Sequence, residues 1–302
     1  MRTIEYLTSA ELASYFWPGI LTTLVIAVLG GAMSWLVVVK RLSFIGQGVS
    51  HSAFGGVGIA LVLGLSGATA AGGLATMAVV LAFSLIAAFG IAVLSGVRSS
   101  RSDTAIGIVL SVAMAIGFLL YRLAEIQAAN SGSPAPPALE QILFGSITLI
   151  GLVDLWIALG TGALVLCVLW LERHRIIFWM FDEGAAPAFG VPVMRIRLLV
   201  MTLLTLVVVV TMKLAGVVLV TAVLVLPGAI ALQLTDRLCR VVALSIAASV
   251  VASLLGLVAA FELDIQPGPT IVLVLGLIYL GAWVPRWLQR KSARRVQPEG
   301  LS

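Results

Sequence analysis

Nine long apolar runs constrain this sequence more than any other feature. A helix needs roughly 20 largely apolar residues to cross the hydrocarbon core of a bilayer. Only 10% of the 302 residues are charged and 61% are apolar, whereas a soluble domain has about 25% charged residues. We therefore predict an all-α, polytopic integral membrane protein with eight to nine spans. The runs are Trp17–Val39, Phe44–Leu65, Ala70–Leu94, Thr104–Tyr121, Leu152–Leu171, Leu198–Met212, Leu214–Leu234, Val241–Phe261 and Thr270–Trp287.

The placement of lysine and arginine favours nine spans with the N-terminus outside. In that arrangement the inner loops and the C-terminal tail hold all of the 18 basic residues except Arg2, Arg122 and Lys213, as the positive-inside rule predicts. Merging the sixth and seventh runs would divide the basic residues about evenly between the two sides. The predicted regions are an extracytoplasmic segment at 1–16, a transmembrane domain at 17–287 and a basic cytoplasmic tail at 288–302.

Several function classes are disfavoured by what the sequence lacks. The net charge of +5 lies in short clusters between apolar runs, which is typical of topology signals rather than of a nucleic-acid-binding face. Cys167 and Cys239 have neither metal-site spacing nor a disulfide pattern. There is no Gly-x-x-x-x-Gly-Lys-Ser/Thr loop. If transport is driven by ATP, hydrolysis must therefore take place on another chain, and we expect this chain not to be an enzyme.

The second apolar run contains the densest set of polar side chains at bilayer depth. Gln47 and His51 are four residues apart and therefore share a helix face, with Ser50 beside them. His51 follows Arg41 by ten residues, or about 15 Å of helix, which places it near the middle of the membrane. An imidazole there can bind a transition metal without burying a permanent charge. We predict a transient metal site at His51, supported by Gln47 and Ser50. The alternative is a histidine that only hydrogen-bonds a neighbouring helix.

A long inner loop is predicted at residues 172–197. Between Phe181 and Pro192 it combines an acidic start at Asp182 and Glu183, small residues and a Gly-x-Pro end. Acidic residues at the start of a helix and glycine at its end are ordinary capping signals. A short helix here could dock into a groove on a cytoplasmic partner. The alternative is an interfacial turn without a partner.

Five sequence elements carry a resemblance to a known family. They are Lys40–Ser52 (KRLSFIGQGVSHS), Asp103–Ile108 (DTAIGI), the Phe181–Pro192 segment, Gly216–Pro227 with Leu234–Leu238, and Gly268–Leu273. In this order they resemble the ABC-3 permeases, the membrane subunits of bacterial zinc, manganese and iron uptake systems, from about Trp17 to Trp287. One departure is Gln47, where the family typically has aspartate. A neutral amide oxygen attracts a dication less strongly than a carboxylate does.

The resemblance implies a multi-pass permease of the bacterial cytoplasmic membrane. Its implied partners are a second permease copy (homodimer or pseudo-dimer), cytoplasmic ABC ATPase subunits and an extracytoplasmic metal-binding protein, with no nucleic acid. No cofactor would stay bound, because the divalent metal ion is the cargo and ATP binds the partner subunit. The pathway would contain His51, with Asp264 near its external mouth. The implied ATPase-coupling residues are Asp182, Glu183, Ala186, Gly190 and Pro192.

Two rival functions stay open at this stage. An ABC permease for a chelated metal or a cobalamin-type cargo would need a wide cavity, so competition between bare ions and chelates would distinguish it. A secondary carrier driven by an ion gradient would need carboxylates inside the membrane. The predicted spans hold almost none of these apart from Asp154, which lies near an end.

Overall fold

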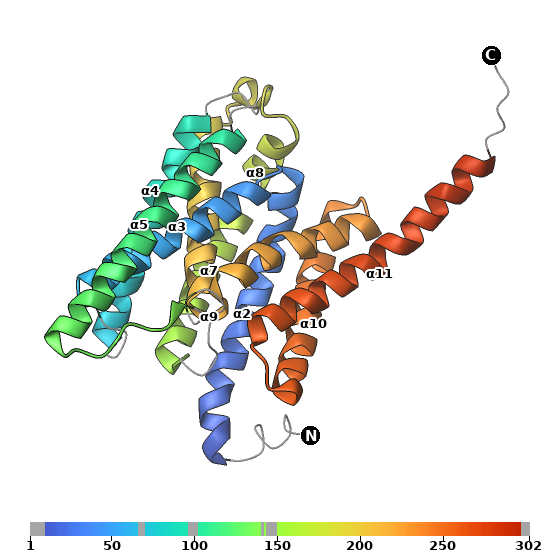
Figure 1. Ribbon diagram of the computed structural model, residues 1–302. Helices are drawn as coiled ribbons and strands as arrows, with labels where there is room; N and C mark the ends of the chain where they lie inside the picture. The colour runs from blue at the N-terminus through green and yellow to red at the C-terminus, as the bar shows by residue number, and fades with distance from the viewer. Residues whose placement is uncertain (1–9, 66–69, 96–101, 140–141, 143–149, 297–302) are drawn as a thin grey trace.

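The computed structural model describes residues 10–65, 70–95, 102–139, 142 and 150–296, and the regular structure within them is helical. This confirms the predicted all-α class for the described part of the chain (Figure 1). Most of the segment predicted at 1–16 and the last residues of the predicted tail lie outside the described residues. The helices are α2 (Ala10–Val39), α3 (Ser43–Val62), α4 (Ala70–Ser95), α5 (Ser102–Ser131), α7 (Leu152–Leu171), α8 (Arg173–Phe181), the 3₁₀ helix η3 (Ala186–Phe189), α9 (Val193–Leu234), α10 (Leu238–Leu263) and α11 (Pro267–Val296).

Seven helical stretches in the described residues are long and apolar enough to cross a membrane. The predicted count of eight to nine spans is therefore not confirmed. Of the two other predicted runs, α3 has sufficient length, but its polar residues and glycines lower its hydropathy. The other run is shorter, at Leu219–Leu234. The seven stretches are Phe16–Val39, Gly72–Leu94, Asp103–Ser131, Leu152–Leu171, Val193–Met212, Leu238–Leu263 and Pro267–Val284.

Helix α9 consists of two helical segments that meet at Gly216. The φ of 70° and ψ of 170° at this residue lie outside the helical region, in a part of backbone space that is essentially restricted to glycine. The sequence predicted a boundary between two runs at Lys213, within one turn of the observed break. The sixth and seventh runs are therefore two helical segments with a break in the backbone between them.

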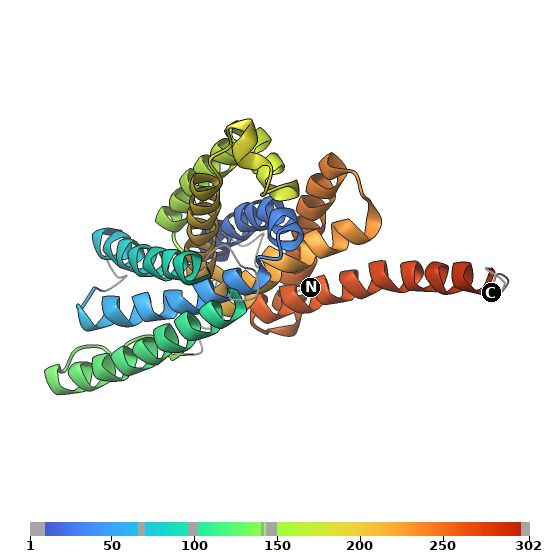
Figure 2. The ribbon, with the colours of Figure 1, turned by 90° about the horizontal axis from the view of Figure 1, so that it is seen from above.

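Helix α9 contacts most of the other helices, and α2 packs against both α9 and α10 (Figures 1 and 2). Helix α3 packs between α4 and α5 and also against α9, while α7 covers α2 and α9. Fully buried side chains such as Leu29, Met33 and Leu36 of α2 and Leu204 of α9 form the main apolar core. Helix α11 packs on α9 and α10 and then extends away from the bundle. Helix α3, which carries the polar cluster, is therefore contacted mainly by three helices, α4, α5 and α9.

Close backbone approach fastens α2 to α9 and α10. A Cβ atom at Gly228 would lie 2.6 Å from the carbonyl oxygen of Ser34, and one at Gly31 would lie 2.7 Å from the Cα atom of Ile246. The Gly228 N–H donates to Ser34 Oγ at 2.6 Å. Small residues allow this approach, which supplies the van der Waals contact that holds helices together in lipid.

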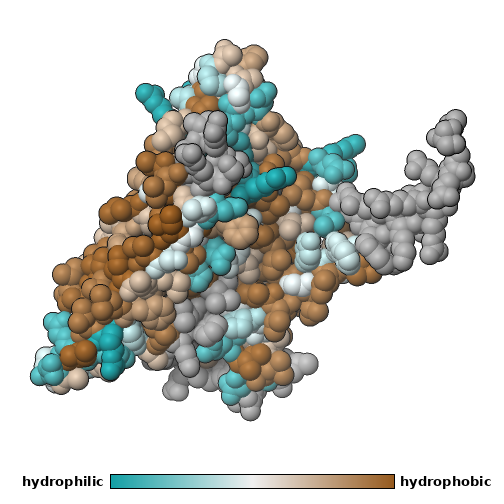
Figure 3. All heavy atoms as spheres, turned by 45° about the horizontal axis from the view of Figure 1, so that its top comes forward, coloured by the Kyte–Doolittle hydropathy of each residue, from teal (hydrophilic) through white to brown (hydrophobic). Residues whose placement is uncertain are grey.

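The outer surface is largely apolar, as expected for a protein solvated by lipid. In Figure 3 hydrophobic residues cover much of the face formed by the left-hand helices of Figure 1, and polar residues gather at its lower tip and at the top. Exposed side chains of this surface include Ile86 and Val93 of α4 and Ile108 and Leu119 of α5. Exposed apolar area of this extent marks a membrane or a protein partner.

Candidate functional site

The predicted metal site lies on α3, and the structure brings two of its residues to one face. Gln47 is exposed and His51 is half-buried, whereas Ser50 and Ser52 are fully buried. The Ser50 hydroxyl donates to the main-chain oxygen of Gln47 at 2.9 Å, and the Ser52 hydroxyl donates to that of Gly48 at 2.6 Å. The serine hydroxyls therefore have partners within α3. The amide of Gln47 and the imidazole of His51 are the groups that this face can offer to an ion.

Asp264 lies apart from that face. It is the C-cap of α10, with a left-handed φ of 56°, and the turn is closed by the Ile265 N–H, which donates to the Ala260 oxygen at 3.1 Å. Aspartate tolerates this backbone region better than most residues. No extensive packing joins α3 to α10 or α11 within the described helices. The structure thus gives Asp264 a local role in the α10–α11 turn.

A permanent metal centre finds no support in the described residues. Within them, no group of three or more His, Cys, Asp or Glu side chains is close enough together to hold an ion. Structural zinc sites usually have four nitrogen or sulfur ligands. One imidazole and one amide on a helix are instead a sparse ligand set, of the kind from which an ion can leave again.

The predicted coupling segment forms a compact turn between α8 and α9. Asp182 caps α8 and accepts a hydrogen bond from the Ala185 N–H at 2.9 Å. Gly190 ends η3 with a left-handed φ of 74°, and Pro192 is the N-cap of α9. Ala186 is fully buried and anchors the segment in the bundle. The predicted short helix is a single 3₁₀ turn that ends at Gly190 as expected, whereas its N-cap is Ala185 and the acidic residues do not lie in its first turn.

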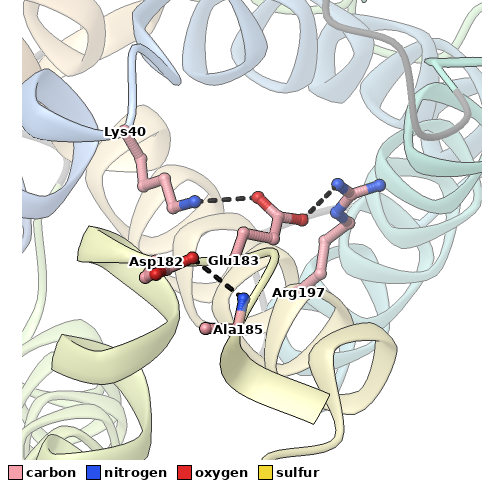
Figure 4. A network of polar contacts seen from close by, with 5 residues as sticks. All are labelled: Lys40, Asp182, Glu183, Ala185 and Arg197. Carbon is pink, nitrogen blue, oxygen red and sulfur yellow. Dashed lines mark hydrogen bonds and ion pairs between the residues drawn. The ribbon is translucent and has the colours of Figure 1, made fainter. Parts of the chain in front are cut away.

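Glu183 joins this segment to two helices, as Figure 4 shows. Its Oε2 atom is 2.8 Å from Lys40 Nζ at the end of α2, and its Oε1 atom is 2.7 Å from Arg197 Nη2 in the first turns of α9. The Lys40 and Arg197 side chains are only 15% and 21% exposed. These are partly buried, charge-assisted hydrogen bonds, which are stronger than those between neutral groups. Lys40 Nζ also lies 4.2 Å from the ring centroid of the buried Trp179 of α8, a cation–π contact.

The charge state of Glu183 follows from these contacts. Burial alone would raise the pKa of its carboxyl, but the hydrogen bond and charge of Lys40, followed by those of Arg197, outweigh burial and hold the pKa below its ordinary value. The carboxylate is therefore ionised at neutral pH, and both ion pairs are present there.

The outward side of the coupling segment is apolar. Phe181 and Phe189 are 69% and 71% exposed, and Pro187, Ala188 and Met194 are also exposed. The Phe189 ring contacts the Phe178 ring at a centroid distance of 5.1 Å. One side of the Phe189 ring is therefore packed, while most of its surface stays accessible. An exposed apolar segment of this kind, held in place by the ion pairs of Glu183, is suited to fill a pocket on a partner protein. We call residues 181–194 the coupling knob.

Two residues of this region were absent from the sequence prediction. Lys40 was recognised only as a topology signal and as the first residue of the Lys40–Ser52 element, and Arg197 only as part of a basic inner loop. Lys40 is 143 positions from its carboxylate partner. Charge at a predicted inner membrane surface is common, so the sequence offers no signal that distinguishes these two cations from their neighbours.

The chain is thus a multi-pass helical membrane protein with a polar face on one enclosed helix and a projecting apolar knob. The family model described as the ABC 3 transport family matches residues 13–285, and the chain belongs to this family. It is 33% identical to the manganese import system permease protein ScaB of Streptococcus gordonii, covering 92% of this chain and 94% of that protein. It is 30% identical to the manganese transport system membrane protein MntC of Halalkalibacterium halodurans, with coverage of 88% and 85%. A solved structure described as PsaBC from Streptococcus pneumoniae in complex with Fab matches with a TM-score of 0.76 at 30% identity, covering 93% of this chain and 94% of that chain.

Proposed function

We propose that this chain is the membrane permease subunit of an ATP-driven importer for a divalent transition metal ion, with manganese as the preferred cargo. Family membership over residues 13–285 carries the permease assignment. The choice of manganese follows two relatives that are named as manganese permeases and match most of this chain. Zinc and iron(II) are the alternative cargoes. The membrane would be the bacterial cytoplasmic membrane, crossed nine times if α3 and Leu219–Leu234 also span it.

The face of Gln47 and His51 is the proposed transit site. A polar side chain at bilayer depth is costly unless it faces protein or a water-filled passage, yet Gln47 is exposed in the single chain. This exposure favours a second permease copy that covers the face and completes a pathway between the two α3 helices. Neutral imidazole and amide groups suit a site from which the cargo must also be released. Asp264, on the exposed α10–α11 turn, would lie near the external mouth, where the metal-binding protein delivers the ion.

The coupling knob is the proposed docking site of the cytoplasmic ATPase. Its exposed Phe189 would fill a pocket on that subunit, while Asp182, Gly190 and Pro192 hold the shape of the turn. ATP hydrolysis on the partner would move the knob and alternate the access of the transit site.

Uptake by the complete transporter in proteoliposomes tests the proposal. The wild type should accumulate Mn²⁺ only with ATP, and chelated metal should compete poorly. His51→Ala should abolish accumulation while the ATPase stays bound, because it removes the imidazole ligand. His174→Ala is the matched control, since the chain has two histidines and His174 is exposed on α8. Normal uptake by His51→Ala contradicts the site, and uptake without any ATPase subunit contradicts the class.

Docking is tested separately by pull-down of the ATPase with the permease. Phe189→Ala should weaken retention of the ATPase, since it removes the exposed ring of the knob. Leu171→Ala removes a side chain that is 63% exposed at the end of α7, outside the knob, and should leave retention unchanged. Equal retention by both variants would place the docking site elsewhere.

A further inference from the structure

We infer that Glu183 is a positioning residue that transmits movement of the coupling knob to α3, through Lys40 on one side and Arg197 on the other. The inference rests on the proposed function, and it adds a specific route between the ATPase side and the transit site. Its basis is that one carboxylate holds cations from two helices, both of which lead to the helix that carries Gln47 and His51.

Two connections lead from Glu183 to α3, and we call them the first and the second arm. The first arm runs through Lys40 and the turn between α2 and α3. Lys40 directly follows the last residue of α2, and α3 begins at Ser43, so few residues separate the ion pair from the site helix. The turn is tightly closed: the Arg41 N–H donates to the Val38 oxygen at 3.1 Å, and the Leu42 N–H donates to the Val37 oxygen at 2.8 Å. These two bonds form a Schellman motif. A displacement of Lys40 is therefore passed on to α3, because no flexible linker separates them.

Arg41 in this turn has a left-handed φ of 56°. Residues with a Cβ atom rarely adopt this region, but it is the conformation that the Schellman motif requires at this position. Arg41 thus lies between the cation that Glu183 holds and the start of α3. Its conformation fixes the direction in which α3 leaves α2, so that a movement of Lys40 is passed on to α3.

The second arm runs through α9. Arg197 is in the first turns of this helix, and α9 packs directly against α3 as well as against α2. A movement of the knob that displaces Glu183 therefore moves the start of α9 together with the end of α2. The two arms converge on α3 from different sides, which is what a change of access at Gln47 and His51 requires.

Glu183 differs in this respect from a neighbouring glutamate of the same inner region. Glu172 pairs with Arg175 at 3.1 Å, three positions further along, and the Arg175 side chain is 59% exposed. That pair joins residues within one short stretch of chain and cannot pass movement between helices. It provides a matched control, because the chemical change from glutamate to glutamine is the same at both positions.

The test compares transport with ATP hydrolysis in the same proteoliposomes, using Mn²⁺ as the probe and the permease assembled with its ATPase and metal-binding protein. Glu183→Gln should lower the number of ions accumulated per ATP hydrolysed by about 2- to 30-fold, the range found for residues that modulate coupling between sites. An amide can accept from one cation but presents N–H donors to the other, so at least one arm is lost. Glu172→Gln should leave the ratio unchanged.

Single-arm variants keep the inference testable if Glu183→Gln assembles poorly. Lys40→Gln and Arg197→Gln should each lower the ions-per-ATP ratio, and Lys40→Arg should restore it, since a guanidinium can still reach the carboxylate. Retention of the ATPase should stay near the wild-type value, although loss of a partly buried ion pair lowers the thermal unfolding temperature. A purely structural role would lower the unfolding temperature without changing the ratio, because the ratio is measured only on transporters that have assembled.

The possible results separate the two proposals. Wild-type ratios in Glu183→Gln and in both single-arm variants would overturn the inference and leave the proposed function standing. Release of the ATPase in step with lost uptake would also overturn it, since Glu183 would then only build the docking surface. Failure of the wild type to accumulate Mn²⁺ with ATP would overturn the proposed function, and the inference with it.

Discussion

The contact between Gly228 and Ser34 allows a quantitative test of how α2 and α9 pack. Replacing Gly228 with alanine adds a Cβ atom 2.6 Å from the Ser34 carbonyl oxygen, 2.7 Å from its carbonyl carbon and 2.8 Å from its Oγ. The first two atoms belong to the backbone, so no side-chain rotation relieves the clash. The two helices must therefore separate locally, and the hydrogen bond from the Gly228 N–H to Ser34 Oγ is weakened.

The expected cost follows from these contacts. Overpacking of a tight interior contact costs about 1–3 kcal/mol, and a weakened buried hydrogen bond adds about 0.5–1.5 kcal/mol. Alanine offsets about 1 kcal/mol through its higher helix propensity. The net destabilisation is about 2 kcal/mol, which corresponds to a decrease in unfolding temperature of about 4–8 °C.

Thermal unfolding of the detergent-solubilised protein, followed by intrinsic tryptophan fluorescence, measures the effect. Gly90→Ala is the control, because a Cβ at Gly90 of α4 would meet no atom within 4 Å. The same gain in helix propensity applies to both variants, so their difference isolates the packing term. Gly90→Ala should be neutral or slightly stabilising. If Gly228→Ala unfolds at the same temperature as Gly90→Ala, the close approach of α2 and α9 is not as the structure describes it.

Three further results are expected. Gly216→Ala should destabilise the protein by about 1–3 kcal/mol, because its φ of 70° with ψ of 170° is disfavoured for any residue with a Cβ; the same unfolding assay measures this, and a neutral result would contradict the observed break in α9. The ion pairs of Glu183 should persist as the pH falls from 8 to 5. A depressed carboxyl pKa contributes stability above the ordinary glutamate pKa of about 4.3, and that stability is lost as the pH falls through the lower folded value. The difference in unfolding temperature between wild type and Glu183→Gln should therefore shrink only in acid, and loss of the difference near pH 6 would contradict this charge state. Gln47→Asp should lower the KM for Mn²⁺ uptake several-fold and slow turnover, because a carboxylate binds the dication more tightly; an unchanged KM would place residue 47 off the pathway.

Local chemistry explains why much of the helical layout was predictable. Apolar runs and the Gly-x-Pro end of the Phe181–Pro192 segment are properties of neighbouring residues, and both produced the expected local structure. The break near Lys213 was also foreseen, although it falls at Gly216, where the required backbone geometry favours glycine. The predicted number of spans was not confirmed, because the polar residues of α3, which include the candidate site, also reduce the hydropathy of this helix.

The candidate site was predicted only in part. The four-residue spacing of Gln47 and His51 fixes their common face in any α-helix, whereas the complete burial of Ser50 depends on which helices surround α3. Capping signals indicated the turn at Asp182 and Gly190. They could not indicate that Glu183 would reach across to Lys40 and Arg197.

The sequence by itself determined that this chain is a bundle of membrane helices, because transfer of about 20 apolar residues into lipid is favourable whatever their neighbours are. Only the tertiary structure decided which helices touch, since the contacts that matter join residues far apart in the chain. Lys40 meets Glu183 across 143 positions, and Ser34 meets Gly228 across 194. In lipid, helix association depends on close packing and hydrogen bonds between particular side chains, and that complementarity exists only once the helices have been brought together.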